Sequence, residues 1–252
     1  MPDSKFMYYI LSGVLAFIPA LIWLITIFRK TKKRGLQTFI FFSGILSVIP
    51  IFAMQYAFKL FPQFNINNFI QAEIKDQNII FLLLFIGVGI TEELVKQGFI
   101  RFLDRRYMMI ETINDSIQFS LVSALGFSFT ENIFYIFSIW TNLGLAQLFI
   151  AYIFRSVFTT CAHLIFSGFF GYYYGIAKFS LNIREQSHWL GRKMIITNML
   201  TRLMNMPRTQ AFKEQTILKG LFIAIFLHAL FDFFLQLNQI LPVAIFVVAG
   251  YL

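Results

Sequence analysis

Long apolar runs, separated by short polar or basic segments, alternate along most of this 252-residue chain. An apolar run of about 20 residues is typical of a membrane-spanning helix. Full-length runs are predicted at residues 7–28, 38–58, 78–102, 117–139, 156–177 and 219–237, and a short one at residues 240–252. The pattern therefore predicts an all-α fold, a polytopic transmembrane helical bundle with six full spans and a short seventh.

Some segments carry further detail. Pro50 in the second run predicts a kink. Residues 146–177 would form about 48 Å of helix against a hydrocarbon core of about 30 Å. We therefore expect either a strongly tilted helix or a short interfacial helix at residues 146–155 that leads into the fifth span. Residues 59–77 are predicted to form a polar loop, and residues 178–219 the longest, basic loop.

Composition supports a membrane protein, because 58% of the residues are hydrophobic and only 13% are charged. Three segments, at residues 29–34, 101–106 and 178–219, hold 16 of the 21 Lys and Arg residues. Basic loops stay in the cytoplasm, so the N-terminus is predicted outside and membrane lipid is the expected surrounding. The net charge of +9 then needs no nucleic acid partner. His188 in the basic loop is expected to be solvated, and the lone Cys161 to serve packing.

Ionisable residues inside the spans are the strongest functional signal, because a charge at bilayer depth costs about 2.5–3.5 kcal/mol. At about 1.5 Å per residue, four different spans place such groups near their midplanes. Polar groups that converge in one layer predict a site that faces the bundle interior. The residues are Glu92, Glu93, Lys96, Glu131, His163, His228 and Asp232, with Arg155 at the edge of the fifth span.

Spacing within the helices suggests pairs. Lys96 follows Glu92 by four positions and Glu93 by three, so it can neutralise one carboxylate and leave the other as a general acid or base. A purely structural ion pair between helices is the alternative. His228 and Asp232 are four apart, so the carboxylate can fix the imidazole tautomer or both can bind a metal.

Four motifs, in order on successive spans, carry a family resemblance. They are Glu92-Glu93-x-x-Lys96, Phe127-x-x-x-Glu131-Asn132, His163 after an Arg-Ser-x-Phe-Thr-Thr lead-in, and His228-x-x-x-Asp232. The chain resembles the PrsW family of intramembrane proteases, relatives of the type II CAAX prenyl endopeptidases. We expect one integral membrane domain, residues 1–252, with two spans lacking a motif (1–77) and a catalytic core of four spans (78–238).

The resemblance implies peptide-bond hydrolysis in or beside the bacterial cytoplasmic membrane, with a single-pass membrane protein such as an anti-sigma factor as substrate. Glu92 or Glu93 would deprotonate a water, while His163, His228 and Asn132 position it or stabilise the oxyanion. Arg155 is a further candidate for substrate or oxyanion binding.

Two chemistries remain open at this point. In the first, His163, His228 and a carboxylate, Glu131 or Asp232, hold Zn²⁺. In the second, a carboxylate activates water without a metal. Other classes also fit charged groups at the midplane, namely a proton- or ion-coupled transporter and an inactive relative that only binds membrane partners. A transporter would favour inverted repeats and helices broken by Gly or Pro at the site, and neither pattern is present.

Overall fold

The computed structural model describes residues 2–29, 33–179 and 195–251, and every regular element in these ranges is helical. Residues 30–32 of the first basic block and 180–194 of the long basic loop, with His188, lie outside the described residues. Six helical segments are long and apolar enough to cross a membrane, and the helix at Ile240–Gly250 is a shorter apolar one. The predicted all-α bundle with six spans and a short seventh is confirmed.

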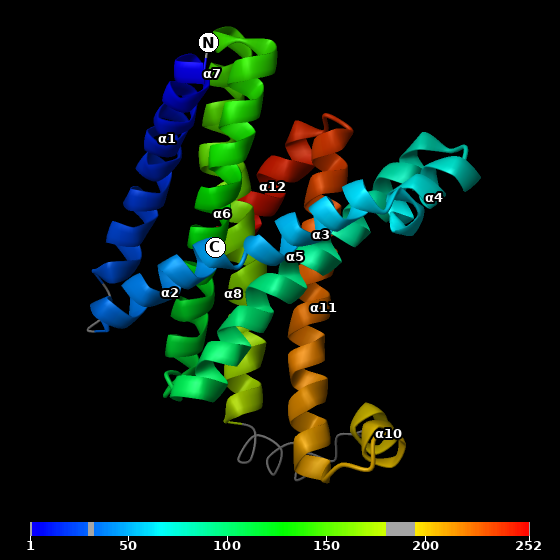
Figure 1. The fold of residues 1–252 in the computed structure, drawn as a ribbon. Helices are drawn as coiled ribbons and strands as arrows, with labels where there is room; N and C mark the ends of the chain where they lie inside the picture. The colour runs from blue at the N-terminus through cyan, green and yellow to red at the C-terminus, as the bar shows by residue number, and fades with distance from the viewer. Residues whose placement is uncertain (1, 30–32, 180–194, 252) are drawn as a thin grey trace.

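Figure 1 shows the order and arrangement of the helices. They are α1 (Pro2–Phe28), α2 (Arg34–Leu46), α3 (Ile49–Leu60), the 3₁₀ turn η1 (Pro62–Phe64), α4 (Ile66–Glu73), α5 (Gln77–Tyr107), α6 (Ile113–Leu143), α7 (Leu145–Phe154), the π-helical η2 (Arg155–Thr159), α8 (Thr160–Lys178), α10 (Ile195–Leu203), α11 (Arg208–Gln236) and α12 (Ile240–Tyr251).

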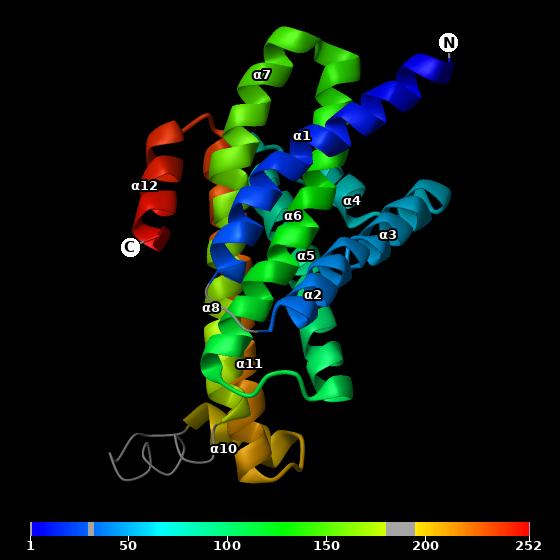
Figure 2. The same ribbon diagram turned by 90° about the vertical axis from the view of Figure 1, so that its left-hand side faces the viewer.

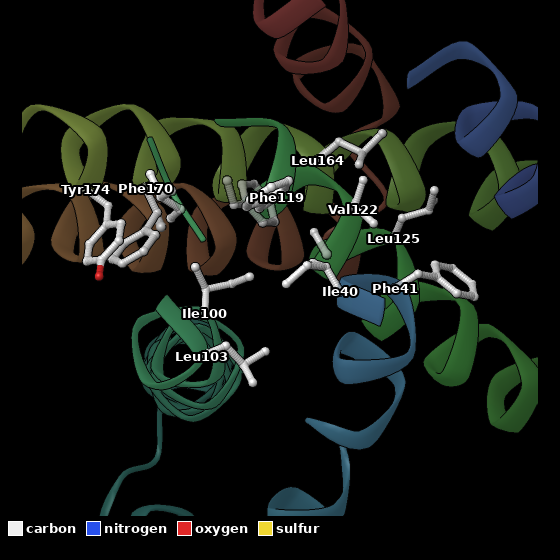
Figure 3. Packing of buried hydrophobic residues seen from close by; sticks show 14 of the residues in the cluster. Ile40, Phe41, Ile100, Leu103, Phe119, Val122, Leu125, Leu164, Phe170 and Tyr174 are labelled. Carbon is white, nitrogen blue, oxygen red and sulfur yellow. The ribbon is translucent and has the colours of Figure 1, made fainter. Parts of the chain in front are cut away.

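Helix α6 organises the bundle, because it packs against α1, α2 and α8. Helix α8 also packs against α11, and α5 crosses α11 obliquely and packs against it (Figures 1 and 2). Figure 3 shows the core between these helices, where Phe119, Val122 and Leu125 of α6 lie beside Ile40 of α2 and Leu164 of α8. This apolar packing holds together the four helices that carry the polar motifs.

A buried carboxylate, that of Asp104, holds the C-terminal end of α5. The charge pattern predicts that this end lies on the cytoplasmic side. Asp104 accepts hydrogen bonds from the Tyr174 hydroxyl at 2.9 Å, from Lys178 Nζ at 2.7 Å and from the Ile110 backbone N–H at 3.0 Å. These bonds join α5 to the end of α8 and to the α5–α6 connection. They fix the helix that presents Glu93 about three turns earlier.

Helices α2 and α6 cross at a very short distance because two glycines face each other's helix backbone. A Cβ placed on Gly126 would overlap the carbonyl of Phe41, and one placed on Gly44 would overlap the carbonyl of Ser123. Small residues are the usual means of close helix approach in membranes. This crossing sets the position of α6, on which Glu131 lies five residues beyond Gly126.

We expect Gly126→Ala to lower the free energy of unfolding by about 1–3 kcal/mol, because the added methyl must push two backbones apart. Gly13→Ala in α1 is the matched control, since no described atom lies within 4 Å of its added Cβ. In a helix interior this control change should be neutral or stabilising by about 0.5–1 kcal/mol. Thermal unfolding in detergent measures both variants, and equal shifts would contradict the close crossing.

The structure departs from the predicted elements at several places. Helical structure stops after Leu46 and resumes at Ile49, with Pro50 in the first turn of α3, so the predicted kink is a short break. The predicted polar loop at 59–77 instead contains η1 and α4, because the Asn65 side chain caps α4 by accepting from the Asn67 N–H. Residues 145–178 stay helical throughout. The π-helical η2 lies at the predicted junction between a short helix at residues 146–155 and the fifth span.

The basic loop is shorter than predicted, because α10 and the first turns of α11 lie within residues 178–219. Hydropathy marks where a helix enters hydrocarbon and not where its backbone becomes helical, so α11 starts earlier, at Arg208. The early turns are also stabilised by an ion pair in which Arg101 Nη2 lies 2.5 and 2.6 Å from the two carboxylate oxygens of Glu214.

Candidate active site

A buried ion pair on α5 forms the base of the site. Lys96 Nζ lies 2.7 Å from Glu93 Oε1, and both side chains are fully buried. Gln97 Nε2 donates to Glu93 Oε2 at 3.0 Å and to Ser167 Oγ of α8 at 2.9 Å. Residues 93, 96 and 97 share one helix face because they are three and four positions apart. Both oxygens of Glu93 are therefore engaged within the protein.

Helix α11 adds His228 to this carboxylate. Its Nδ1 lies 3.0 Å from Glu93 Oε1, and because a carboxylate only accepts, Nδ1 carries the proton. Helix α11 can approach α5 here because Gly89 has no side chain: a Cβ at that position would lie 3.0 Å from the Ile225 carbonyl oxygen and 3.6 Å from His228 Cβ. Phe166 stacks on the imidazole with ring centroids 4.8 Å apart. The ring is thus fixed in one orientation and one tautomer.

The second ring nitrogen of His228, Nε2, points at two carboxylates. It lies 3.6 Å from Glu92 Oε2 and 3.4 Å from Asp232 Oδ2. Glu92 Oε2 is buried and has no hydrogen bond to any described residue. A lone pair on neutral Nε2 facing these oxygens is unfavourable unless a proton or a cation lies between them. Glu92 is consequently the carboxylate of the adjacent pair without a hydrogen bond to a described residue, and Glu93 is the one bonded to His228.

His163 of α8 links the α5 pair to α6. Its Nδ1 lies 3.3 Å from Lys96 Nζ, and its Nε2 lies 2.9 Å from Glu131 Oε2. Because an ammonium only donates, Nδ1 accepts and the Nε2–H donates to Glu131. The rings of His163 and His228 meet edge to face with centroids 5.3 Å apart. The predicted layer of polar groups from four helices is thus present as one connected network.

Arg155 and Asn132 lie deeper in this network than expected. Arg155 Nη2 lies 2.9 Å from Glu131 Oε1, and its Nε donates to Asn132 Oδ1 at 2.8 Å. The guanidinium also lies 4.1 Å from the Tyr135 ring centroid, and Asn132 Nδ2 donates to Thr160 Oγ1 at 3.3 Å. Arg155 is only 8% exposed. The structure therefore pairs both residues inside the protein, next to Glu131.

Arg155 is the first residue of the π-helical segment η2, and this local geometry helps to aim it. A π-turn adds one residue to a helical turn and so changes the direction of the side chains around it. The Arg155 carbonyl accepts from Thr160 Oγ1 at 3.0 Å, five residues later. Such π-turns are frequent at functional sites. The sequence contained no signal for this turn, because residues 145–178 hold no Pro and nothing else that marks a change of helix type.

The donor groups that converge are suited to a metal ion. One ligand atom each from Glu92, His163 and His228 lies within 4.8 Å of the others. Two imidazoles and one carboxylate are a common set for catalytic zinc. The orphan oxygen of Glu92 and the gap before His228 Nε2 fit a cation, although His163 would have to exchange one of its two partners. The carboxylates predicted as third ligand also lie beside the imidazoles, with Glu131 Oε2 at 2.9 Å from His163 Nε2 and Asp232 Oδ2 at 3.4 Å from His228 Nε2.

Comparison with known proteins identifies the family once this geometry is established. The family described as "PrsW family intramembrane metalloprotease" matches residues 32–252. The chain belongs to this family. A Protease PrsW from Oceanobacillus iheyensis is 30% identical over 181 residues, which are 71% of this chain and 74% of that protein. A Protease PrsW from Geobacillus kaustophilus is 25% identical over 154 residues, 61% of this chain and 58% of that protein. No solved structure matches the chain.

Membership in the PrsW family confirms the resemblance read from the four motifs. The chain is an integral membrane protein and an intramembrane protease, of a family described as metalloproteases. A cavity of about 650 Å³ is apolar and lies away from the polar network, between α1, α6, α8 and α12. Cys161 is half-buried and lines that cavity.

Two residues of this PrsW-family site were not assigned a role from the sequence. Gln97 is an amide residue within a span, four positions after Glu93. That spacing was the feature of the sequence that could have indicated its hydrogen bond to Glu93. Phe127 places its ring centroid 4.5 Å from Lys96 Nζ, which stabilises the buried ammonium. Ser167 follows His163 by four positions on α8, but its bond to Gln97 depends on how α8 faces α5.

Substitution of Arg155 tests whether it positions Glu131. We expect Arg155→Met to lower kcat of the protease by about 10-fold or more while KM stays nearly unchanged, because second-layer partners of a site cost about 10–100-fold. Arg155→Lys should recover part of the activity, since it keeps the charge but not the two-pronged geometry. A rise in KM with unchanged kcat would instead assign Arg155 to substrate binding.

Proposed function

We propose that this chain is a site-1-type protease that cuts a single-pass membrane protein, such as an anti-sigma factor, beside its membrane segment. The observation that carries the proposal is the buried, unbonded Glu92 oxygen between two imidazoles in a layer crossed by four spanning helices. Peptide-bond hydrolysis needs such a proton acceptor next to fixed polar groups. The side chains of Asp232 and Glu131 are 21% and 33% exposed, so the layer is not sealed.

The roles of the chain's own residues follow from their contacts. Glu92 takes a proton from a water as the water oxygen bonds to the substrate carbonyl carbon. The same proton then passes to the amide nitrogen as the C–N bond breaks, so that a carboxyl and an amine end are released. His228, held by Glu93, and His163, held by Glu131, keep fixed positions on either side. Lys96 neutralises Glu93 and so keeps a second negative charge from opposing the reaction.

We propose Zn²⁺ as the metal of this site, held by His163 and His228, with Glu92 beside it as the base that takes the proton of the reacting water. When bound there, it would act as a Lewis acid that polarises the reacting water and carbonyl. Metal analysis of purified protein tests the assignment. We expect about one zinc per chain in the native protein and a strong loss in His163→Ala, with His188→Ala as the control that keeps its zinc. Equal zinc in the native protein and His163→Ala would remove the assignment.

We further propose the bacterial cytoplasmic membrane as the location, with the N-terminus outside and the basic segments in the cytoplasm. The distribution of Lys and Arg supports this orientation. The ion pairs Arg101–Glu214 and Lys178–Asp104 lie in or next to those segments. Cleavage in the polar layer would then release the outer part of a substrate, which suits a regulated response to events outside the cell.

The substrate can be found by comparing bacteria that express the native chain with bacteria that express Glu92→Gln. N- and C-terminal fragments of single-pass membrane proteins are mapped by mass spectrometry in both. We expect a juxtamembrane cut in the native strain and in the control Glu73→Gln, whose carboxylate is exposed on α4. The cut should be missing in Glu92→Gln. Identical fragments in all strains, with equal amounts of inserted protein, would favour the transporter or the non-cutting binder.

A further inference from the structure

Helix α10 exposes an apolar side that no described part of the chain covers. Ile195, Ile196, Met199 and Leu203 are each more than half exposed. At about 100° per residue these four side chains fall within roughly a third of the helix circumference. Thr197 is buried on another side, where its hydroxyl donates to Gln215 of α11 at 2.5 Å. The remaining side is polar, so α10 has a buried edge, an apolar face and a polar face.

The level of α10 along α11 is fixed by that contact. Gln215 precedes Ile217 by two residues, or about 3 Å, and Ile217 begins the apolar part of α11. Its neighbour Glu214 forms the ion pair with Arg101 of α5. Charged pairs at this level mark the edge of the hydrocarbon core. Helix α10 therefore lies where α11 enters the membrane, and Figures 1 and 2 show it beside the end of α11, on the side remote from α7.

We propose that α10 is an interfacial helix whose apolar face is inserted between the headgroups and acyl chains of the surrounding bilayer. An amphipathic helix with cationic residues beside its apolar face lies in the membrane plane in this way. Arg202 borders the apolar face of α10, and Arg208 and Lys213 lie in the first turns of α11. These positive charges complement anionic lipid headgroups. Continuity with α11, which itself spans the membrane, makes the bilayer the surface nearest to that face.

The consequence of this arrangement is an anchor for α11. A helix held in the interface opposes movement, in either direction along the membrane normal, of the span to which it is bonded. Helix α11 carries His228 and Asp232, so the depth of these two residues of the polar layer depends on its position. This inference concerns lipid contact and holds whether or not the proposed substrate is correct.

Nitroxide labels measure the depth of α10 directly. Cys161 is the one cysteine of the sequence, so Cys161→Ala gives a background in which one label can be placed at a time. Met199→Cys lies on the apolar face, and the matched control Asn198→Cys lies on the adjacent exposed polar side. Each labelled full-length chain is reconstituted in vesicles of phosphatidylethanolamine and phosphatidylglycerol. Collision rates with oxygen and with a water-soluble nickel complex are then compared by electron paramagnetic resonance.

We expect the label at 199 to collide severalfold more often with oxygen than with the nickel complex, and the label at 198 to show the reverse. Equal access of nickel to both labels would place the apolar face in water and overturn the proposal. Protection of the 199 label from both reagents would overturn it as well, because it would show a protein surface, such as a second copy of the chain, covering the helix. Replacing phosphatidylglycerol by phosphatidylcholine should make the 199 label shallower, and an unchanged depth would refute the role of the basic residues.

Discussion

Glu92→Gln is expected to reduce the rate of proteolysis by about 10²–10⁴-fold, the range that a positioned acid or base contributes. The amide keeps the size of the side chain but cannot take the proton of the attacking water. Because Glu92 makes no hydrogen bond to a described residue, its replacement should leave the free energy of unfolding within about 0.5 kcal/mol of the native value. Cleavage of a reconstituted substrate and thermal unfolding in detergent give the two readouts.

Glu93→Gln is the informative comparison for this result, because it changes the neighbouring carboxylate by the same single group. Glu93 pairs with Lys96, Gln97 and His228, so its loss should lower stability as well as activity. If Glu92→Gln were the unstable variant and Glu93→Gln the stable one, the division of roles between the two carboxylates would be wrong. Glu73→Gln, on the exposed helix α4, should change neither quantity.

Lys96→Met is expected to lower the free energy of unfolding by about 3–5 kcal/mol, the cost of leaving one member of a buried ion pair without its partner. The methionine fills much of the space of the lysine stem, so the loss arises from the uncompensated carboxylate of Glu93, which is fully buried. Lys59→Met is the matched control, because Lys59 is exposed at the end of α3 and its replacement should be nearly neutral.

A double-mutant cycle isolates the pair itself. The chain with both Lys96→Met and Glu93→Gln should be more stable than the sum of the two single losses predicts, because neither charge is then left alone. Thermal unfolding of the four chains measures this coupling. Additive losses would mean that Lys96 serves another partner, of which His163 is the nearest candidate at 3.3 Å.

The path of the chain through the membrane was predictable because lipid leaves few alternatives to a helix. Backbone N–H and C=O groups in hydrocarbon must form hydrogen bonds within their own segment, so an apolar run of sufficient length already predicts a helix. The cost of a charge at depth likewise marked Glu92, Glu131, His163 and His228 before any contact was known. The order of these residues on successive spans was sufficient to indicate the PrsW family.

The ends of the helices were less predictable because they depend on local capping and on contacts beyond the hydrocarbon. Asn65 starts a helix inside a predicted loop, and the pair of Arg101 with Glu214 stabilises α11 before its apolar part begins. These polar contacts leave no trace in hydropathy. The π-turn at Arg155 was hidden as well, because one extra residue in a helical turn leaves no mark in the hydropathy of residues 145–178.

The sequence by itself determined the fold class, the layer of polar groups and the family, because all of these follow from composition at a given depth and from motif order. Only the tertiary structure decided which of two adjacent carboxylates is free. Glu92 and Glu93 point about 100° apart around α5. The side chain of Glu93 therefore faces Lys96 and His228, whereas Glu92 keeps an oxygen without a hydrogen bond to a described residue. Helix rotation is set by close packing, here at Gly89 against α11.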